Sequence, residues 1–447
     1  MKRILVLSVF IAESLQLNAQ RLLTFEEAVK IGLKNGVALA QQQNNLVNSQ
    51  MQKTAAWAGF GPTLSATSTY NQINGNFFNQ NEGKVVNGLF NQVSGSLNAG
   101  INVFNGFSQI NRVKQFNYQL DAQAQFVNRS KQDIVNTVAI QYLQVLLDVE
   151  LLRIANENWE ALKKQLDQTI EQVKVGARSP VDEYNQDSQA KAAEIRTLQA
   201  EIALVTDKTL LSQTLLLDPS EEFNLVKPDW DLNAMGLETS ELTKDYETAL
   251  KSRGDFLRAE KNELSSKFAM KSSKGNLMPS LFGFWNLNSA YNKLDGDVTA
   301  LDFNPQLKDN LRKSYGIQLS IPILGGNSIF QNRANYVQQK VSYLNSQILK
   351  KNTEIQVKTD VSRAHQNLKL IKRTYTVTLS QLEAAEKAFS FESERYNLGI
   401  TNFVDFANAN RVFVQAQTDK AQAEYRLLFQ KIAIDYATGT LKTDNFE

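Results

Sequence analysis

The sequence contains one large internal duplication, and this feature constrains the fold more than any other. Three short motifs appear twice in the same order, with the second copy 217, 219 and 223 residues after the first. The paired motifs are Gly61-Pro62-Thr63-Leu64 with Met278-Pro279-Ser280-Leu281, Val103-Phe104-Asn105-Gly106 with Pro322-Ile323-Leu324-Gly325, and Val175-Gly176-Ala177 with Leu398-Gly399-Ile400. Solenoid repeats span only about 20–50 residues. The chain therefore holds two copies of one long segment, which we place at 20–217 and 240–438.

Each copy predicts the same order of elements: a helix, two strands, a very long helix and a returning helix. The expected helices cover about 24–58, 107–175 and 181–217 in the first copy and about 240–275, 327–398 and 404–438 in the second, and the strands lie within about 62–106 and 279–324. Only 7 prolines occur in 447 residues, so long stretches contain no helix breaker. Apolar residues in the long helices are spaced alternately by four and three, which is typical of coiled coils. A helix of about 70 residues is a rod of roughly 100 Å.

The predicted strands alternate between apolar and polar residues. The apolar series are Leu97, Ala99, Ile101 and Val103 in the second strand, and Tyr315, Ile317, Leu319, Ile321 and Ile323 in the fourth. A period of two gives each strand one apolar and one polar face. Aromatic residues near the strand ends suit the two interfaces of a membrane. A soluble hairpin with an aromatic core is the alternative interpretation of the same pattern.

The first residues, 1–19, resemble a secretory signal peptide. Lys2 and Arg3 provide the positive start, residues 4–12 form a short apolar run, and Ala19 suits the cleavage site. The alternative, a transmembrane anchor, would need about 20 apolar residues. The chain has no cysteine, so it can form neither a disulfide nor a lipid-modified N-terminal cysteine.

The strand count predicts that several chains share one barrel. Four strands of about 12 residues are long enough to cross a bilayer, which takes about 9–11 tilted residues. Single-chain barrels begin at about 8 strands, so one chain cannot close a barrel by itself. Both strand pairs start from helices and return to helices, so the helices extend from one side of that barrel. The expected fold class is mainly α with membrane β: long antiparallel coiled-coil helices that form an α-barrel, continuous with a four-strand contribution to a shared β-barrel.

With these features the chain resembles the TolC-like outer-membrane efflux proteins over almost its whole mature length. The most specific element is the pair of glycine turns, each followed by a Val-Asp pair. The resemblance implies a homotrimer whose twelve strands form one barrel in the lipid of the outer membrane, with a large periplasmic portion. It also implies a periplasmic adaptor (membrane fusion protein) and an inner-membrane pump, in a tripartite efflux or type I secretion system. Residues 218–239 resemble the equatorial insertion of this family, and 439–447 remain as a C-terminal tail.

The resemblance also assigns a gate at the narrow periplasmic entrance. Asp405 matches one acidic gate position, whereas Asn408 stands at the second and halves the expected negative charge. Thr401 stands where the family has an arginine that helps to hold the closed state. Arg178 on the other turn is one candidate to replace it, and other links to Asp182 or Glu183 are the alternative. Asp182 is a further gate candidate. The alternative is that Asp182 and Asp405 only begin helices, where a carboxylate favours the helix dipole.

The two glycine turns are predicted to form a tip that contacts the adaptor. The tip residues are Val175, Gly176, Ala177, Leu398, Gly399 and Ile400. Glycine supplies the left-handed backbone that a tight turn between helices requires, and it leaves the surface flat. Turn geometry alone is the alternative explanation for both glycines.

Composition argues against other classes of function. Lys+Arg 48 and Asp+Glu 46 leave a net charge of +2, which gives no electrostatic footprint for nucleic acid. His365 is the single histidine, and the absence of cysteine removes the common zinc patterns. No phosphate-binding loop occurs. We therefore expect no enzymatic activity, cofactor or metal. The alternative function is that of a periplasmic coiled-coil scaffold or adaptor protein.

Overall fold

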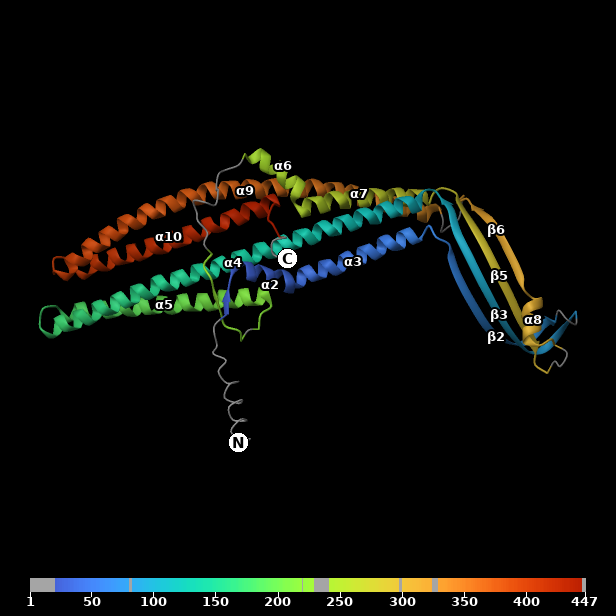
Figure 1. Ribbon diagram of the computed structural model, residues 1–447, viewed down its shortest axis with the longest axis horizontal. Helices are drawn as coiled ribbons and strands as arrows, with labels where there is room; N and C mark the ends of the chain where they lie inside the picture. Colours follow the sequence, from blue (N-terminus) through green and yellow to red (C-terminus); the bar gives the residue numbers. More distant parts are fainter. Residues whose placement is uncertain are drawn as a thin grey trace, which may run out of the picture. The chain divides into compact units, whose positions relative to one another are not determined.

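The computed structural model describes residues 21–79, 83–218, 220–228, 241–296, 300–323 and 329–443. In chain order the elements are β1 (Arg21–Leu23), α2 (Phe25–Asn35), α3 (Val37–Ala58), β2 (Thr63–Asn79), β3 (Lys84–Asn105), α4 (Ser108–Lys174), α5 (Pro180–Leu215), β4 (Phe223–Leu225), α6 (Leu242–Ser252), α7 (Gly254–Gly275), β5 (Ser280–Leu294), α8 (Phe303–Asp309), β6 (Arg312–Ser320), α9 (Ile329–Asn397) and α10 (Phe403–Thr438) (Figure 1). The predicted signal peptide lies outside the described residues, as do residues 219 and 229–239 of the predicted insertion and 444–447 of the tail.

The chain divides into two compact units. The helical unit comprises Met1–Asn44, Gln125–Leu257 and Thr353–Glu447, and it contains both glycine turns. The strand unit comprises Asn45–Ala124 and Arg258–Asn352, and it contains the strands β2, β3, β5 and β6. The long helices α4 and α9 contribute residues to both units. In the described part of the chain, no helix combines the length and the apolar character needed to cross a membrane.

The core of the helical unit surrounds Tyr142 of α4, whose side chain is fully buried. Its hydroxyl lies 2.9 Å from the carbonyl oxygen of Leu23 and 2.6 Å from that of Val226. Leu23 belongs to a small parallel sheet in which β1 pairs with β4, with Leu23 opposite Leu225, and Val226 directly follows β4. This sheet was not predicted, because two strands of three residues carry no periodic pattern. It joins the start of the described chain to the described part of the predicted insertion.

The predicted first helix, 24–58, is wrong in one respect, because it is two helices separated by Gly36. The start is as expected: Thr24 accepts a hydrogen bond from the Glu27 N–H at 3.2 Å, and the Glu27 carboxylate accepts one from the Thr24 N–H at 3.3 Å. Gly36 leaves helical geometry with a ψ of 105°. A side chain at this position would collide with Ile134, so the close approach of the two helices requires glycine.

The helix predicted at 240–275 is likewise divided, into α6 and α7, at Arg253. Arg253 is extended, with φ −72° and ψ 120°, and its side chain is buried. The guanidinium forms ion pairs with Asp255 at 2.5 Å and Asp360 at 3.0 Å, and it donates to the Ala437 carbonyl at 3.3 Å. The break in the helix allows a buried charge to obtain these partners, without which its burial would be costly.

In the strand unit, four antiparallel strands form a sheet in the order β2-β3-β5-β6. One cross-strand row consists of Leu64, Ala99, Trp285 and Tyr315, and another, on the opposite face, consists of Thr67, Ser96, Asn288 and Arg312. Cross-strand neighbours share a face, so these rows give the sheet a more apolar and a more polar face, with Phe282 and Phe284 of β5 on the face of the second row. The alternation predicted for the second and fourth strands is present where β3 and β6 are paired.

The fourth strand is shorter than predicted, because β6 ends at Ser320 and not near residue 324. Pro322 has no N–H to donate to a neighbouring strand, which explains the early end. At its other end β6 pairs with β5 only as far as Arg312 opposite Asn288.

Beyond that point, the unpredicted helix α8 takes the place of a paired strand beside β5. The Gln306 side chain accepts from the Asn292 N–H at 3.0 Å and donates to the Asn292 carbonyl at 3.0 Å. Asn310 donates to the Ala290 carbonyl at 2.6 Å, and the Ser289 hydroxyl donates to the Leu307 carbonyl at 2.6 Å. Side chains thus bind the Asn292 N–H and the Asn292 and Ala290 carbonyls in the part of β5 that β6 does not reach.

Candidate functional site

The two predicted tip turns have nearly the same backbone. Gly176 has φ +77° and Gly399 has φ +72°, both in the left-handed region that favours glycine. In the first turn the Gly176 N–H donates to Val173 at 2.9 Å and the Ala177 N–H donates to Gln172 at 2.8 Å. The second turn has the equivalent bonds, from Gly399 to Tyr396 at 3.1 Å and from Ile400 to Arg395 at 2.8 Å. This is the Schellman pattern that ends a helix and satisfies its last carbonyls.

Apolar side chains at the tips are exposed. Val175, Leu398 and Ile400 have exposed fractions of 79%, 75% and 63%. No described atom lies within 4 Å of the position that a Cβ would take on Gly176 or Gly399. Each tip therefore presents a small apolar surface next to a flat segment of backbone.

The helices after the two turns start differently. Ser179 caps α5 by accepting from the Val181 N–H at 3.2 Å, and Pro180 follows at the first helical position. Asn402 caps α10 by accepting from the Asp405 N–H at 2.9 Å. Proline at the first position and polar caps are both typical of helix starts.

The predicted gate residues Asp405 and Asn408 are held by different partners. The Asp405 carboxylate accepts from the Asn402 amide at 3.0 Å and from the Thr401 hydroxyl at 3.3 Å. The Asn408 side-chain oxygen accepts from Arg411 at 2.8 Å. Asp405 therefore contributes to the start of α10, as in the structural alternative, while its side chain remains exposed. Thr401 is one of the groups that orient it.

Arg178 of the first turn binds the second turn. Its guanidinium donates to the Tyr396 carbonyl at 2.6 Å, and its central carbon lies 3.9 Å from the centre of the Tyr396 ring. A charge-assisted hydrogen bond and a cation–π contact thus join the two hairpins. Asp182, half-buried in the first turn of α5, also acts on Tyr396 through its charge. Burial is the main cause that raises the pKa of Tyr396; Arg178 opposes this effect, and Asp182 adds to it.

Tyr396 belongs to an aromatic cluster that sequence analysis missed. Its ring stacks on that of Phe406 with the ring centres 4.7 Å apart, and the Phe389 ring stacks on that of Phe413 with the centres 5.2 Å apart. The cluster also includes Leu162, Ala190 and Ala193, with Trp159, Leu166 and Phe403 packed against it. Phe389 and Tyr396 are seven residues apart, as are Phe406 and Phe413, so the heptad spacing could have identified them.

The histidine of the helical unit is engaged by a neighbouring side chain. His365 Nε2 pairs with the Asp245 carboxylate, and both side chains are mostly buried. Among the described residues, no group of three or more histidine, cysteine or acidic side chains could hold a metal ion.

Comparison with known proteins gives a consistent result. The model of a family described as "Outer membrane efflux protein" matches residues 28–215 and 246–440, one segment in each copy. A search of curated proteins by sequence found no match.

Solved structures share the fold at low identity. The outer membrane protein VceC from Vibrio cholerae has a TM-score of 0.80 at 13% identity, over 93% of this chain and 96% of that chain. The CmeC outer membrane channel of Campylobacter jejuni has a TM-score of 0.78 at 15% identity, over 94% and 88%. The open state of the MtrE outer membrane channel of Neisseria gonorrhoeae has a TM-score of 0.74 at 15% identity, over 93% and 88%. The predicted fold class is thereby confirmed.

Proposed function

The chain belongs to the outer membrane efflux protein family, and on that premise we propose that three copies assemble into the exit duct of a tripartite efflux or type I secretion system. The protein is an efflux channel of the outer membrane with a large periplasmic helical portion. The duct would pass small molecules or polypeptides that an inner-membrane pump and a periplasmic adaptor deliver.

The proposal that several chains share one barrel rests on the four-stranded sheet, which has two different faces and two outer strands, β2 and β6. Within the described residues, β2 and β6 each pair with a single neighbour, so each has an outer edge. An unpaired backbone group in hydrocarbon costs several kcal/mol, and a closed barrel removes such edges. Three copies supply twelve strands, which exceeds the roughly 8 strands of the smallest barrels. The apolar row at Leu64, Ala99, Trp285 and Tyr315 supports a lipid-facing outer surface and argues against the alternative, a periplasmic scaffold.

In this proposal the tips form the gate. Arg178 takes over the role of the arginine that Thr401 replaces, because its bond to the Tyr396 carbonyl holds the two hairpins together. Opening would require that bond to break. Copies of Asp405 around the threefold axis would place a ring of negative charge at the entrance, with Asp182 nearer the contact between hairpins.

The exposed apolar tip residues provide the surface for the adaptor. Val175, Leu398 and Ile400 are the side chains available for contact, and Gly176 and Gly399 allow close approach. Because both turns share one backbone geometry, an adaptor can bind the two tips of each chain in the same manner.

The experiment is to express the full-length gene and to fractionate the cells. We expect a trimer in the outer membrane that conducts ions after reconstitution into planar lipid bilayers. Deletion of residues 1–19 should abolish delivery, since these residues are proposed as the signal peptide. A mature wild-type chain that stays soluble without detergent and forms no channel would favour the scaffold alternative. Normal fractionation of the deletion variant would reject the signal peptide alone.

A further inference from the structure

The four long strands carry only positive charge. Strands β2, β3, β5 and β6, as described, contain no aspartate or glutamate. Their basic residues are Lys84, Lys293, Arg312 and Lys313. A sheet without acids presents a net positive potential wherever one of these side chains reaches water.

Neighbouring basic residues of β6 lie on opposite faces. Arg312 is opposite Asn288, and the same row continues to Ser96 and Thr67, on the polar face. Lys313 is opposite Leu287, in a row that continues to Leu97 and Ala66 on the other face. The chain therefore offers a matched pair of charges, one residue apart, on the two faces of one strand.

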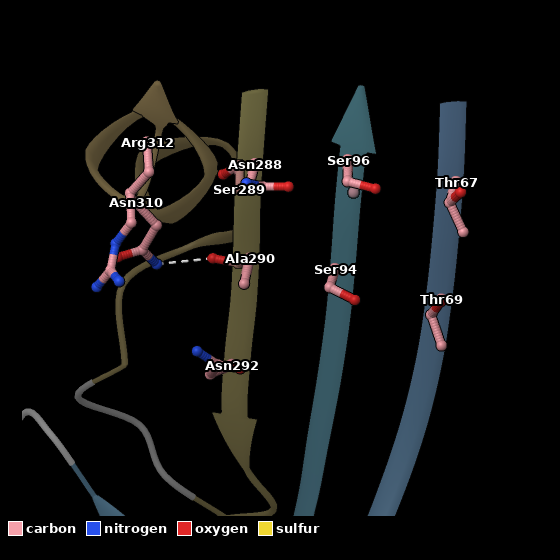
Figure 2. A pocket seen from close by; sticks show the side chains of 11 residues that line it. Thr67, Thr69, Ser94, Ser96, Asn288, Ser289, Ala290, Asn292, Asn310 and Arg312 are labelled. Carbon is pink, nitrogen blue, oxygen red and sulfur yellow. Dashed lines mark hydrogen bonds between the residues drawn. The ribbon is translucent and has the colours of Figure 1, made fainter. Parts of the chain in front are cut away.

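The polar face contains a shallow hollow next to Arg312 (Figure 2). Its volume is about 390 Å³, and it is open to one side. The lining consists mainly of hydroxyl and amide side chains together with this one guanidinium, namely Thr67, Thr69, Ser94, Ser96, Asn288, Ser289, Asn292, Asn310 and Arg312, with Gly95 and Ala290. Hydroxyls, amides and a guanidinium can all donate hydrogen bonds, and the hollow contains no carboxylate to compete for them.

Arg312 is available for a ligand. Its side chain is exposed, and among the described residues it forms no hydrogen bond or ion pair. Figure 2 shows it beside Asn310, whose amide is already bound to the Ala290 carbonyl. The acids nearest in sequence, Asp302 and Asp309, belong to the α8 connection and are not part of the lining. A guanidinium in this position can form a two-pronged bond with a phosphate, sulfonate or carboxylate group.

We propose that the polar face of the sheet is an anion-binding surface on the lumen of the duct, centred on Arg312 in each copy. The ligand class is small solutes that carry a phosphate, sulfonate or carboxylate group, with hydroxyls or amides that the threonine, serine and asparagine side chains can bind. This inference rests on the proposed function, because the polar face must line the lumen for solutes to reach it.

A single cysteine can report the local potential, since the chain has none of its own. Asn288→Cys places a thiol directly opposite Arg312, about 5 Å away between Cβ atoms. The measurement is the rate of modification of the full-length trimer by an anionic reagent, 2-sulfonatoethyl methanethiosulfonate, divided by the rate with the cationic trimethylammonium analogue. We expect Arg312→Gln to lower this ratio about fivefold and Arg312→Lys to preserve most of it. Lys313→Gln, on the other face, should leave it unchanged.

A salt titration tests the same point without any change at Arg312. The rate ratio of Asn288→Cys should fall toward that of a free thiol as the salt concentration approaches 1 M, where screening extends only about 3 Å. A ratio that is insensitive to salt and to Arg312→Gln would overturn the proposal. A ratio that responds to Lys313→Gln instead would overturn the assignment of the faces.

Single-channel recording separates this proposal from the proposed function. With inorganic pyrophosphate added on the barrel side, the wild-type current should be partly blocked, and Arg312→Gln should weaken the block at least several-fold. Absence of any wild-type channel would reject the duct itself. Wild-type channels with equal block in Arg312→Gln would reject the anion surface and leave the duct intact.

Discussion

The two helical tips come from duplicated sequence and keep the same backbone, but their side chains have taken different tasks. At an offset of 223 residues Gly176 matches Gly399 and Asp182 matches Asp405, while Arg178 matches Thr401. Both glycines adopt the same left-handed conformation and end their helices with the same pair of bonds. In the contact between the tips, Arg178 of the first tip provides the cation, and the Tyr396 carbonyl of the second tip accepts its hydrogen bond. Glycine is present at both turns because few other residues adopt the left-handed backbone that each turn requires.

The partner of Arg178 shows the same division. Tyr396 occupies the position of Val173 in the first copy, and it is buried to 1% exposure where Val173 is only partly buried. The second hairpin thus provides an aromatic core and a carbonyl, and the first provides the charge. The two copies therefore differ at both positions that take part in the contact.

The largest expected effect on stability comes from truncating the two matched residues, Tyr396 and Val173, to alanine. Tyr396→Ala should lower the free energy of unfolding by about 3–4 kcal/mol, because a buried, stacked ring is lost. Val173→Ala should lower it by only about 1 kcal/mol. Denaturant unfolding of the purified variants measures both values. Equal losses would mean that the tips have equivalent cores.

A smaller effect is expected where the two tips meet. Arg178→Ala removes a hydrogen bond and a cation–π contact, together worth about 1–2 kcal/mol. Amide hydrogen exchange should therefore be faster at both turns, and single-channel conductance should rise if the contact keeps the entrance narrow. Thr401→Ala, at the matching position, should change exchange only around the second turn. If Thr401→Ala matched Arg178→Ala in conductance, Arg178 would not have replaced the family's arginine.

The turns themselves should respond alike. Gly176→Ala and Gly399→Ala should each cost about 1 kcal/mol from the positive φ, with no added clash. Gly176→Val and Gly399→Val should also obstruct the adaptor and abolish export while trimers still form. Thermal unfolding and a cargo export assay measure the two consequences. Full export by both valine variants would remove the tips from the adaptor contact.

The smallest effect on stability is expected for the acids. Asp405→Asn and Asp182→Asn should each change it by roughly 0.5 kcal/mol, since each is a helix-start carboxylate. Asp405→Asn should nevertheless reduce cation preference in single-channel recordings, and Asp182→Asn should reduce it less. Because Asn408 is neutral, no second acid is expected to compensate. Identical ion preference in the wild type and in Asp405→Asn would leave Asp405 with its capping role alone.

Local patterns predicted most of the fold. The strand alternation and the uninterrupted heptads specify faces at short range, and the structure places those strands and long helices within a few residues of the expected bounds. The breaks at Gly36 and Arg253 were not predictable in this way. At both positions the break coincides with a close contact to a group far along the chain, Ile134 in one case and Asp360 in the other.

The candidate site was predictable only in part. The glycine turns could be read directly, because a left-handed residue after a long helix is a local requirement. The bond from Arg178 to Tyr396 spans 218 residues, and a single sequence contains no signal for such a pair. The sequence analysis named Arg178 as a cation on a tip, but it did not name Tyr396, although the heptad spacing to Phe389 could have identified it.

Gln306 of α8 and Asn310, which follows it, affect how much unpaired strand edge the chain exposes before it assembles. An exposed strand edge is a template on which foreign strands can grow, and a protein that crosses the periplasm as a monomer would carry such edges with it. Gln306 and Asn310 already occupy the part of the β5 edge that β6 leaves open. In the described sheet, the outer edges of β2 and β6, which sister chains are proposed to cover, and the β3 edge before Phe90 then remain open to unwanted pairing before assembly.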